Sequence, residues 1–218
     1  LPLEEAISKI LDNIKTLPSC EKPIFESLGL TLAEPIYSNV DNPPTSVSSM
    51  DGYAISSKDI VNKNFSLKCI GETYAGKKRK DRLNPGETIR IFTGSELPKG
   101  ADTVVIQEDT IIDIINPDKI IFKSKNIIKG QYIRRKGLDF INGQKLIDEN
   151  RILNVRSIAL AASAGVSWAS VIQKPKIAIL STGNELIRPG EFNKKNTNNI
   201  FSSNGIFLYN FIKTMGAE

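Results

Sequence analysis

The sequence predicts an α+β protein of more than one domain, because three regions of the chain differ in texture. Residues 3–16 repeat apolar side chains at helical spacing, which is typical of an amphipathic helix. Residues 55–129 contain many short runs of β-forming residues separated by Gly, Pro and Asn. From residue 176 an apolar run precedes a second helical pattern, which is the order of strand and helix in an α/β unit. The chain has 218 residues, enough for one large domain or two modest ones.

The first region begins with an amphipathic helical pattern. Its apolar positions, with charged residues between them, are Leu3, Ala6, Ile7, Ile10, Leu11 and Ile14. A second short element follows Lys22 and cannot run past Pro35, because proline ends a helix. Residues 41–49 are predicted to form a loop, since the pair Pro43-Pro44 can neither continue a helix nor donate to a central β-ladder.

The middle region is predicted to form a β-barrel or a β-sandwich. Its β-type runs read FSLKCIG, ETIRIFTG, ADTVVIQEDTIID and KIIFKS. Short strands at this spacing, with turn residues between them, are typical of such folds. The sequence NPDK at residues 116–119 joins two of these runs and predicts a hairpin turn.

The last part of the chain alternates between helical and strand-like patterns. Small and apolar residues from 155 to 164 predict a helix that closes at Gly165, and the strand-like run VSWASVI follows it. The run KIAILSTGNEL predicts a buried parallel strand that breaks at Thr182-Gly183, and NGIFLYNFIKTMGAE predicts a helix. Because one strand and one helix cannot bury their own apolar faces, we expect the chain to be a piece of a longer protein.

The composition excludes several kinds of chemistry. The chain has no histidine, which excludes Ser-His-Asp and Cys-His nucleophiles and any histidine-ligated metal. Its two cysteines, Cys20 and Cys69, have neither metal-type nor CxxC spacing, and each can be a small buried apolar residue. A bound metal would therefore be a hard cation on oxygen ligands, with Mg²⁺ the first choice. No apolar run approaches the roughly 20 residues that span a bilayer, so we expect a soluble intracellular protein.

The net charge of +5 raises the question of a polyanionic partner. Basic residues gather in the runs GKKRKDR at 76–82, KSKNIIKG at 123–130 and IRRKG at 133–137. We interpret most of these side chains as solvated loops. A nucleic-acid-binding barrel is an alternative hypothesis that only the charge favours, since aromatic residues are 7% of the chain and none is interleaved with the basic runs.

Four stretches, in this order along the chain, look like one protein family. They are SSMDGYAIS at 48–56, IRIFTGSELPKGADTVVIQED at 89–109, GQYIRRKGLDFINGQKL at 130–146 and KIAILSTGNELIRPGE at 176–191. Over essentially its whole length the chain resembles the molybdopterin molybdenumtransferases, the MoeA type that includes the E domain of gephyrin. The resemblance is specific because the four motifs are collinear and keep family-like spacing.

The resemblance implies a function, a domain layout and partners. Enzymes of this family insert molybdate into adenylylated molybdopterin with Mg²⁺ and release AMP. A mixed N-terminal domain of residues 1–40 and 130–173 would carry an inserted β-barrel-like domain of residues 41–129, and residues 174–218 would begin an α/β molybdopterin-binding domain. Family members are cytoplasmic homodimers whose cleft is shared between subunits. The molybdopterin adenylyltransferase is a candidate partner, and neither nucleic acid nor a membrane is implied.

The same resemblance assigns roles to individual residues. The catalytic positions that it implies are Asp51, Thr93, Asp139 and Glu185. The cofactor-binding positions are Gly94, Ser95, Thr182, Gly183, Ser203 and Asn204. Asp51 and Glu185 would also hold the metal. Asp102 and Glu108 match family positions as well, and we interpret them as structural or modestly supportive rather than catalytic.

Asp51 has two interpretations at this point. The residues alone favour a tight turn in MDGYA, because Asp and Gly suit turns for backbone reasons. The resemblance reverses this preference and makes Asp51 a cleft carboxylate that ligates Mg²⁺ or orders water around an oxyanion, with Met50 and Tyr53 packed inward. Thr93-Gly94-Ser95 is likewise either a simple strand end or a loop whose backbone N–H groups receive an anion.

Three positions depart from the family pattern. Leu138 stands where the family has a glutamate, and Asn184 and Ser202 each stand where it has an aspartate. These lost acids support a second hypothesis, a non-catalytic scaffold or a degenerate fragment of the same family. We expect this chain alone to be inactive, because the family's other cleft residues would follow Glu218.

Overall fold

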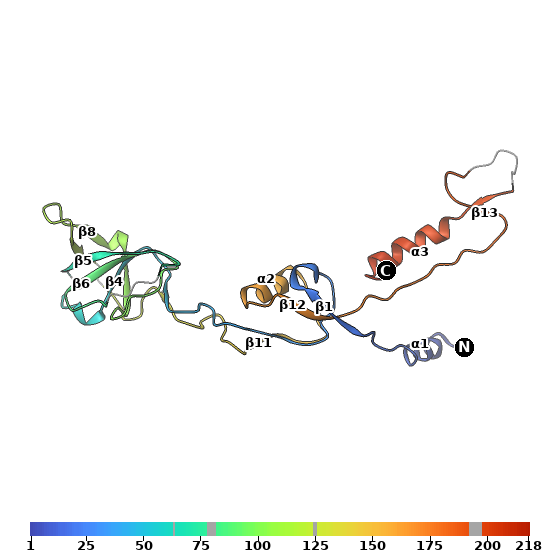
Figure 1. Cartoon of the computed structure of the whole chain (residues 1–218), viewed down its shortest axis with the longest axis horizontal. Helices are drawn as coiled ribbons and strands as arrows, with labels where there is room; N and C mark the ends of the chain where they lie inside the picture. The colour runs from blue at the N-terminus through green and yellow to red at the C-terminus, as the bar shows by residue number, and fades with distance from the viewer. Residues whose placement is uncertain (63, 78–81, 124–125, 192–197) are drawn as a thin grey trace. The chain divides into compact units, whose positions relative to one another are not determined.

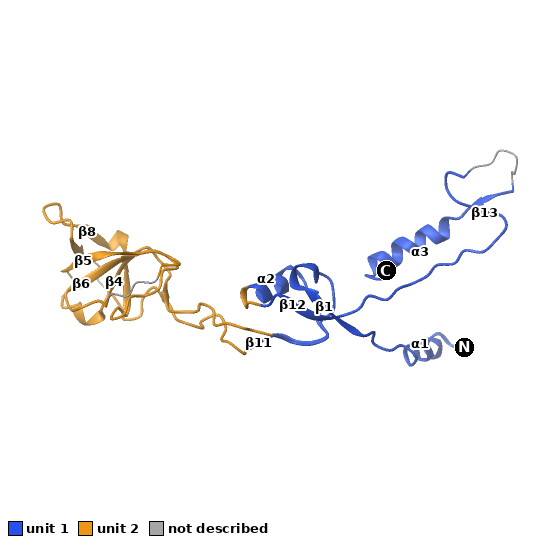
Figure 2. Cartoon of the chain, viewed as in Figure 1, with its two compact units in different colours: residues 1–36, 145–162, 166–218 blue, residues 37–144, 163–165 orange. Residues whose placement is uncertain are grey.

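The fold consists mostly of strands, with three α-helices, in the part of the chain that the structure describes (Figure 1). The structure is a computed structural model and describes residues 1–62, 64–77, 82–123, 126–191 and 198–218. The chain divides into two compact units (Figure 2). Unit 1 comprises residues 1–36, 145–162 and 166–218, and unit 2 comprises residues 37–144 and 163–165.

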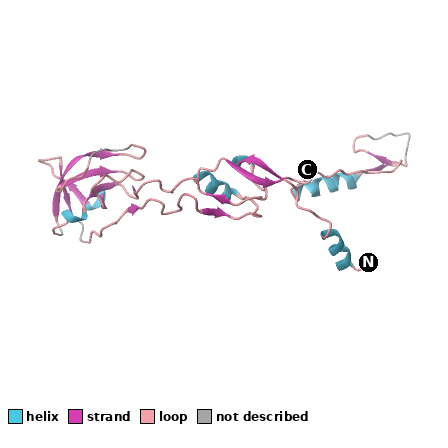
Figure 3. Cartoon of the chain, turned by 60° about the horizontal axis from the view of Figure 1, so that its bottom comes forward, coloured by secondary structure: helices cyan, strands magenta, loops and turns pink. Residues whose placement is uncertain are grey.

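Unit 2 is built on a curled six-stranded sheet (Figure 3). Its strands are β4 (Gly52–Ile55), β5 (Phe65–Thr73), β6 (Glu87–Ile91), β7 (Thr103–Ile106), β8 (Thr110–Ile112) and β9 (Lys119–Phe122). They lie in the order β7-β4-β6-β5-β9-β8, and only β5 and β6 pair in parallel. The four predicted β-type runs are therefore confirmed as strands, and they form a half-barrel with β7 and β8 at its edges.

Alternation along the strands decides which side chains form the core of unit 2. In β5, Phe65 and Leu67 are buried whereas Ser66 and Lys68 are exposed, as expected for a strand with one covered face. The main apolar cluster comprises Tyr53, Ile55, Phe65, Leu67, Val105, Ile120 and Phe122. Within it, the rings of Phe65 and Phe122 stack with their centroids 4.8 Å apart. Burial of each large apolar side chain stabilises the fold by roughly 1.5–3 kcal/mol.

The predicted turn at residues 116–119 is confirmed as the connection of the antiparallel pair β8–β9. The Asp113 carboxylate accepts hydrogen bonds from the N–H groups of Ile115 and Asn116, at 2.9 and 3.2 Å. The Asn116 carbonyl accepts a third from the Lys119 N–H at 2.9 Å. An aspartate that binds the backbone in this way replaces ladder hydrogen bonds where the chain reverses.

Unit 1 has a smaller core, formed by a two-stranded sheet, a helix and the segments beside them. β1 (Ser19–Pro23) pairs antiparallel with β12 (Trp168–Ile172), and β2 (Ile36–Tyr37) pairs with β11 (Lys145–Ile147). The predicted helix is confirmed as α2 (Val155–Ser163), and Gly165 follows it at φ 75°, a conformation that glycine adopts without strain. The buried residues of this core are Ile24, Leu32, Ile36, Leu153, Ala161, Ala169 and Val171.

Two predictions for unit 1 are wrong in part. The first helix, α1 (Leu3–Leu11), ends before residue 16, and none of its residues is buried. The apolar run KIAIL forms no strand, and Ile177 and Leu180 are 47% and 87% exposed. A buried parallel strand needs neighbouring strands and a covering layer. In this structure the backbone of the segment is hydrogen-bonded to Glu218, through the Ile177 N–H and the Pro175 carbonyl, in the pattern of a parallel pair. These two bonds do not cover the apolar side chains of the run.

The predicted C-terminal helix is confirmed as α3 (Ser203–Thr214). Before it, β13 (Leu186–Ile187) and β14 (Ile200–Phe201) form a short parallel pair. Among the described residues, no helix combines the length and the apolar character that crossing a membrane requires.

Gly52, the first residue of β4, is required by the close approach of a neighbouring backbone. A Cβ atom at this position would lie 1.9 Å from the carbonyl oxygen of Val105 in β7. We expect Gly52→Ala to lower the free energy of unfolding by about 3 kcal/mol, because rigid backbone blocks the methyl group. Urea denaturation followed by circular dichroism measures the loss.

Gly86→Ala is the matched control for this substitution. Gly86 has a φ of 81° and nothing within 4 Å of its added Cβ, so only backbone strain of about 1 kcal/mol is expected. A loss for Gly52→Ala no larger than the loss for Gly86→Ala would contradict the steric argument.

Candidate functional site

The bend that carries Asp51 is held by hydrogen bonds on both sides. It joins β3 (Val47–Ser48) to β4, and β3 pairs antiparallel with β10 (Ile133–Arg134). The Ser48 hydroxyl donates to the Met50 carbonyl at 2.6 Å, and the Gln107 N–H donates to the Asp51 carbonyl at 3.1 Å. MDGYA is therefore a bend that leads directly into a central strand, and its backbone fixes the position of Asp51.

Thr93 stabilises the charged form of the Asp51 carboxylate. One oxygen, Oδ1, accepts hydrogen bonds from both the backbone N–H and the hydroxyl of Thr93, each at 2.8 Å. These two bonds, the backbone one first, hold the pKa of Asp51 below its ordinary value; slight burial opposes them and the charge of Arg90 assists them. No described residue donates to the second oxygen, Oδ2, which leaves it available to a cation or to water.

The side chains beside Asp51 follow the predictions only in part. Tyr53 is buried in the core of unit 2, as expected. Met50 is 40% exposed, so the expectation that it packs inward is wrong. The difference arises because Tyr53 lies within β4, between two strands, whereas Met50 lies in the bend before it.

The segment Thr93-Gly94-Ser95 uses its backbone to build the site. The N–H groups of these residues donate to the Asp51 carboxylate, the Ser48 carbonyl and the Phe92 carbonyl respectively. The expectation that they receive an anion is therefore wrong, since each is already engaged. Ser95 is fully buried and its hydroxyl donates to the Thr73 carbonyl at 3.1 Å. Gly94 has a φ of 80°, which lets the chain turn back towards Ser48.

Arg90 is a residue of this site that the sequence reasoning missed. It lies on β6 directly across from Tyr53, and its guanidinium carbon lies 5.0 Å from the ring centroid of Tyr53 and 5.1 Å from that of Phe92. Its Nη2 donates to Oε1 of Gln107. The signal in the sequence is an arginine among apolar residues in IRIF, where a half-buried strand position rarely takes a charge without a reason.

Asp139 lies in unit 2 and is paired with a neighbouring arginine. Arg134 Nη2 donates to its Oδ2 at 2.6 Å, and the pairing of β10 with β3 places Arg134 opposite Val47. Arg134 therefore balances the charge of Asp139, although Leu138 stands where the family has a glutamate. Among the described residues, Asp51 and Asp139 are not part of any group of three or more Asp, Glu, Cys or His side chains that could hold a metal ion.

Several basic side chains of the predicted runs also form ion pairs. Lys136 lies 2.9 Å from Asp41, and Lys129 lies 3.6 Å from Asp102. Residues 78–81 and 124–125 of two runs lie outside the described residues. These two lysines are paired within the fold, and the choice between solvated basic loops and a nucleic-acid-binding surface stays a prediction.

The remaining predicted site residues lie in unit 1, around the start of α3. Gly183 has a φ of 147°, and a Cβ there would lie 2.6 Å from Oε1 of Glu185, so only glycine allows this carboxylate to fold back on the loop. A Cβ at Gly205 would lie 3.1 Å from the Ser181 hydroxyl. The segment with Thr182 and Gly183 therefore lies against the first turn of α3, which Ser203 and Asn204 open. The structure therefore places the loop of Thr182, Gly183 and Glu185 near the start of α3, where Ser203 and Asn204 lie.

The two groups of predicted residues thus belong to different units. Asp51, Thr93, Gly94, Ser95 and Asp139 lie in unit 2, whereas Thr182, Gly183, Glu185, Ser203 and Asn204 lie in unit 1. Within the described residues, no group of three or more Asp, Glu, Cys or His side chains could hold a metal ion. A joint metal site of Asp51 and Glu185 stays a prediction.

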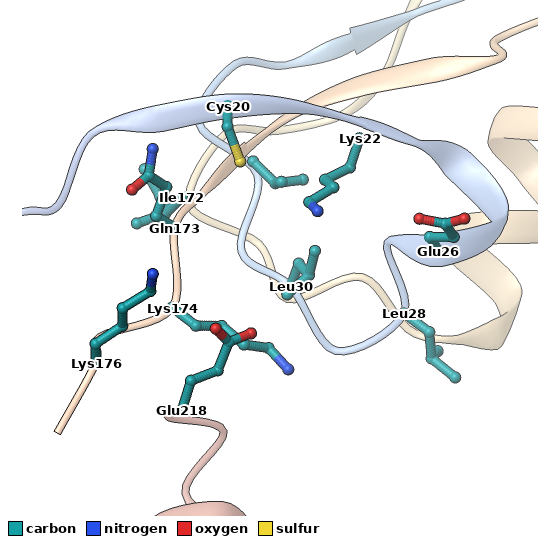
Figure 4. A pocket seen from close by; sticks show the side chains of 11 residues that line it. Cys20, Lys22, Glu26, Leu28, Leu30, Ile172, Gln173, Lys174, Lys176 and Glu218 are labelled. Carbon is teal, nitrogen blue, oxygen red and sulfur yellow. The ribbon is translucent and has the colours of Figure 1, made fainter. Parts of the chain in front are cut away.

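Unit 1 also contains an open cavity of about 320 Å³ that involves none of the predicted site residues (Figure 4). It is lined by Cys20, Leu28, Leu30 and several charged side chains, among them Lys22, Lys174 and Glu218. Cys20 is half-buried and packs against the core of unit 1, in keeping with a small apolar role.

The fold and the carboxylate bend identify the class of protein. A sequence model described as the MoeA N-terminal region (domain I and II) matches residues 1–165, and the chain belongs to this family. The curled sheet with its helices is also found in a molybdopterin biosynthesis MoeA protein from Pyrococcus horikoshii OT3. That crystal structure matches with a TM-score of 0.87 and 31% identity, over 100% of this chain and 58% of the other.

Curated relatives carry a more particular name. A protein of Nostoc sp. named molybdopterin molybdenumtransferase is 35% identical over 205 residues, which is 89% of this chain and 44% of the relative. A protein of Staphylococcus aureus with the same name is 29% identical over 222 residues, covering 100% of this chain and 52% of the relative. The chain spans about half the length of the curated relatives that it matches.

The Thr93 hydroxyl is expected to contribute to the low pKa of Asp51. Thr93→Val removes the hydroxyl bond and keeps the backbone one, so the pKa of Asp51 should rise towards its ordinary value of about 3.9. Carbon-13 NMR of the Asp51 carboxyl group during a pH titration measures this shift. Thr93→Ser keeps the hydroxyl and serves as the control; equal pKa values in all three proteins would contradict the assigned cause.

Asp102 is a structural carboxylate, as interpreted from the sequence. Its Oδ1 accepts hydrogen bonds from the N–H of Ser57 at 2.6 Å and the hydroxyl of Thr103 at 3.0 Å. Its Oδ2 accepts one from the Ser57 hydroxyl at 2.7 Å. Partial burial acts to raise the pKa of Asp102, but these bonds outweigh it and the pKa lies below its ordinary value.

This geometry predicts a pH-dependent contribution to stability. A carboxylate whose pKa is lower in the folded than in the unfolded chain stabilises the fold above the unfolded value of about 3.9, and the contribution is lost as the pH falls through the folded value. We expect Asp102→Asn to lower the free energy of unfolding by about 1–2 kcal/mol at pH 7 and by progressively less as the pH falls below the unfolded value and through the lower folded value. Urea denaturation across this range measures it, and a difference independent of pH would refute the assignment.

Proposed function

We propose that the chain is the N-terminal part of an enzyme of molybdenum cofactor biosynthesis, which inserts molybdate into adenylylated molybdopterin and releases AMP. Family membership supports the pathway, and relatives that carry the name molybdopterin molybdenumtransferase support the transferase class. The geometry of Asp51 is the single observation that supports a role of this chain in the chemistry. Thr93 stabilises the charged form of its carboxylate on a fixed backbone, and no described residue donates a hydrogen bond to Oδ2.

The protein's tasks in such a reaction are orientation and electrostatics. Insertion of an oxyanion into a dithiolene needs no protein nucleophile, which agrees with a chain that has no histidine. Thr93 would hold Asp51 in its charged form and in one orientation. Because the bond to Thr93 occupies only Oδ1, Oδ2 would meet the cation or water that accompanies the substrate.

Mg²⁺ fits Asp51 as a partial ligand set. A carboxylate oxygen is the hard ligand that Mg²⁺ prefers, and Mg²⁺ is commonly bound by one or two carboxylates together with water and substrate phosphates. When bound, the ion would neutralise phosphate charge. Asp51 would supply one such ligand, and Glu185 is proposed as the second.

The other roles follow the same proposal. Asp139 and Thr93 act with Asp51, while Gly94, Ser95, Thr182, Gly183, Ser203 and Asn204 shape the region that receives the pterin and nucleotide. The complete enzyme is proposed to be a cytoplasmic homodimer with a cleft shared between subunits, with the adenylyltransferase as a candidate partner. The layout of an inserted domain over residues 41–129 belongs to this proposal too.

Asp51→Asn in the complete protein tests the proposal. It removes the charge and keeps the size of the side chain, so we expect the rate of molybdate insertion to fall by about a hundredfold. The rate is measured with adenylylated molybdopterin, molybdate and Mg²⁺, with AMP release as the readout.

Asp113→Asn is the matched control, because Asp113 also accepts two backbone N–H bonds in unit 2 but lies in the β8–β9 turn. It should retain full activity. If Asp51→Asn instead inserts molybdate at the normal rate, the enzyme role of this bend fails, and a non-catalytic scaffold becomes the better interpretation of Leu138, Asn184 and Ser202.

A further inference from the structure

Arg90 is oriented by three neighbours in unit 2. Its guanidinium lies against the rings of Tyr53 and Phe92, at 5.0 and 5.1 Å from their centroids. Phe92 in turn stacks on Tyr74 with centroids 4.8 Å apart and planes 7° from parallel. The hydrogen bond from Nη2 to Gln107 limits rotation of the group in its own plane. A planar cation held by ring faces and one edge contact has little rotamer freedom left to lose on binding.

The same neighbours connect Arg90 to the Asp51 bend. Gln107 accepts from the guanidinium with its side chain and donates to the Asp51 carbonyl with its backbone N–H. Tyr53, which lies opposite Arg90, is two residues after Asp51, and Thr93, which binds the carboxylate, is three residues after Arg90. The arginine and the aspartate are thus fixed on one small piece of the sheet.

The guanidinium has more donors than partners. Arginine carries five N–H donors, and Gln107 accounts for one of them. Among the described residues, no carboxylate lies within 4.0 Å to form an ion pair with Arg90. Contacts with aromatic rings use the face of the group, and no described residue other than Gln107 accepts a hydrogen bond from its N–H edge. A role limited to packing does not require this edge, which matches two oxygens of a tetrahedral anion.

We propose that Arg90 binds a tetrahedral oxyanion of the substrate, next to the carboxylate of Asp51. Molybdate and the phosphate of a bound nucleotide share this chemistry. This inference rests on the proposed function and adds the group that binds the anion. The N–H groups of residues 93–95 cannot bind it, because each already donates a hydrogen bond within the fold. An arginine beside a cation-binding carboxylate would separate the anion from the aspartate and fix its orientation.

Isothermal titration of the 218-residue chain, without added metal, tests this proposal. Sodium molybdate and AMP are titrated separately, so that the two sources of oxyanion are distinguished. We expect Arg90→Gln to weaken binding of at least one of them by tenfold or more. Arg90→Lys keeps the charge but loses the two-donor edge, and is expected to weaken the same ligand by a smaller factor.

Gln107→Ala keeps the arginine and removes only the hydrogen bond to its N–H edge, so we expect a loss of anion affinity between those of the two Arg90 variants. Gln107 is exposed, so the fold should tolerate this substitution. Arg82→Gln, an exposed arginine of the same unit, removes the same net charge and should leave binding unchanged. Circular dichroism of each variant reports whether the sheet is intact. If Arg90→Gln does not fold, Arg90→Lys and Gln107→Ala decide the outcome.

Three results would overturn the proposal: no millimolar binding of either anion by the unaltered chain, equal binding by all Arg90 and Gln107 variants, or an equal loss in Arg82→Gln. These results concern anion binding alone. The insertion assay with Asp51→Asn is independent of them, so a failure of Arg90 as the anion ligand is distinguishable from a failure of the proposed function.

Discussion

The insertion of β4 between β6 and β7 is the constraint on which the site in unit 2 depends. The strand can enter only because Gly52 has no side chain, since a Cβ there would lie 1.9 Å from the Val105 carbonyl oxygen. The position of β4 places Asp51 beside Thr93, which follows β6, and beside Gln107, which follows β7. The Asp-Gly pair, which suggests a turn, is in this protein a carboxylate followed by the glycine that lets a central strand begin.

The charged groups of this site are held by neutral groups more than by other charges. The N–H and hydroxyl of Thr93 are the main stabilisers of the charged form of Asp51, and Arg90 is held by two aromatic ring faces and the side-chain amide of Gln107. Among the described residues, neither Asp51 nor Arg90 forms an ion pair. A site arranged in this way keeps one anionic and one cationic group for ligands, which suits a substrate that combines a metal ion with oxyanions.

The second group of family positions is arranged on a different principle. Gly183 lies against the Glu185 carboxylate, and the loop containing both lies against the first turn of α3. The chain places these residues in unit 1 and the Asp51 bend in unit 2, and it spans about half the length of its curated relatives. In our proposal, a cleft shared between two subunits uses both groups.

Local patterns in the sequence were sufficient for strands β5 to β9 of unit 2, the β8–β9 turn, α2, α3 and the family motifs. These features depend on residues close together in the chain, such as the alternation in β5 or Asp113 in its turn. Pairing between distant segments decided the rest. Contacts between strands decide the burial of Ser95, the exposure of Met50 and the position of Arg90 opposite Tyr53. These contacts join residues far apart in the sequence, such as Arg90 and Gln107, which are 17 positions apart, and Asp51 and Thr93, which are 42 positions apart. The apolar run KIAIL is uncovered for the same reason, because its own residues cannot supply the neighbouring strands that would bury it.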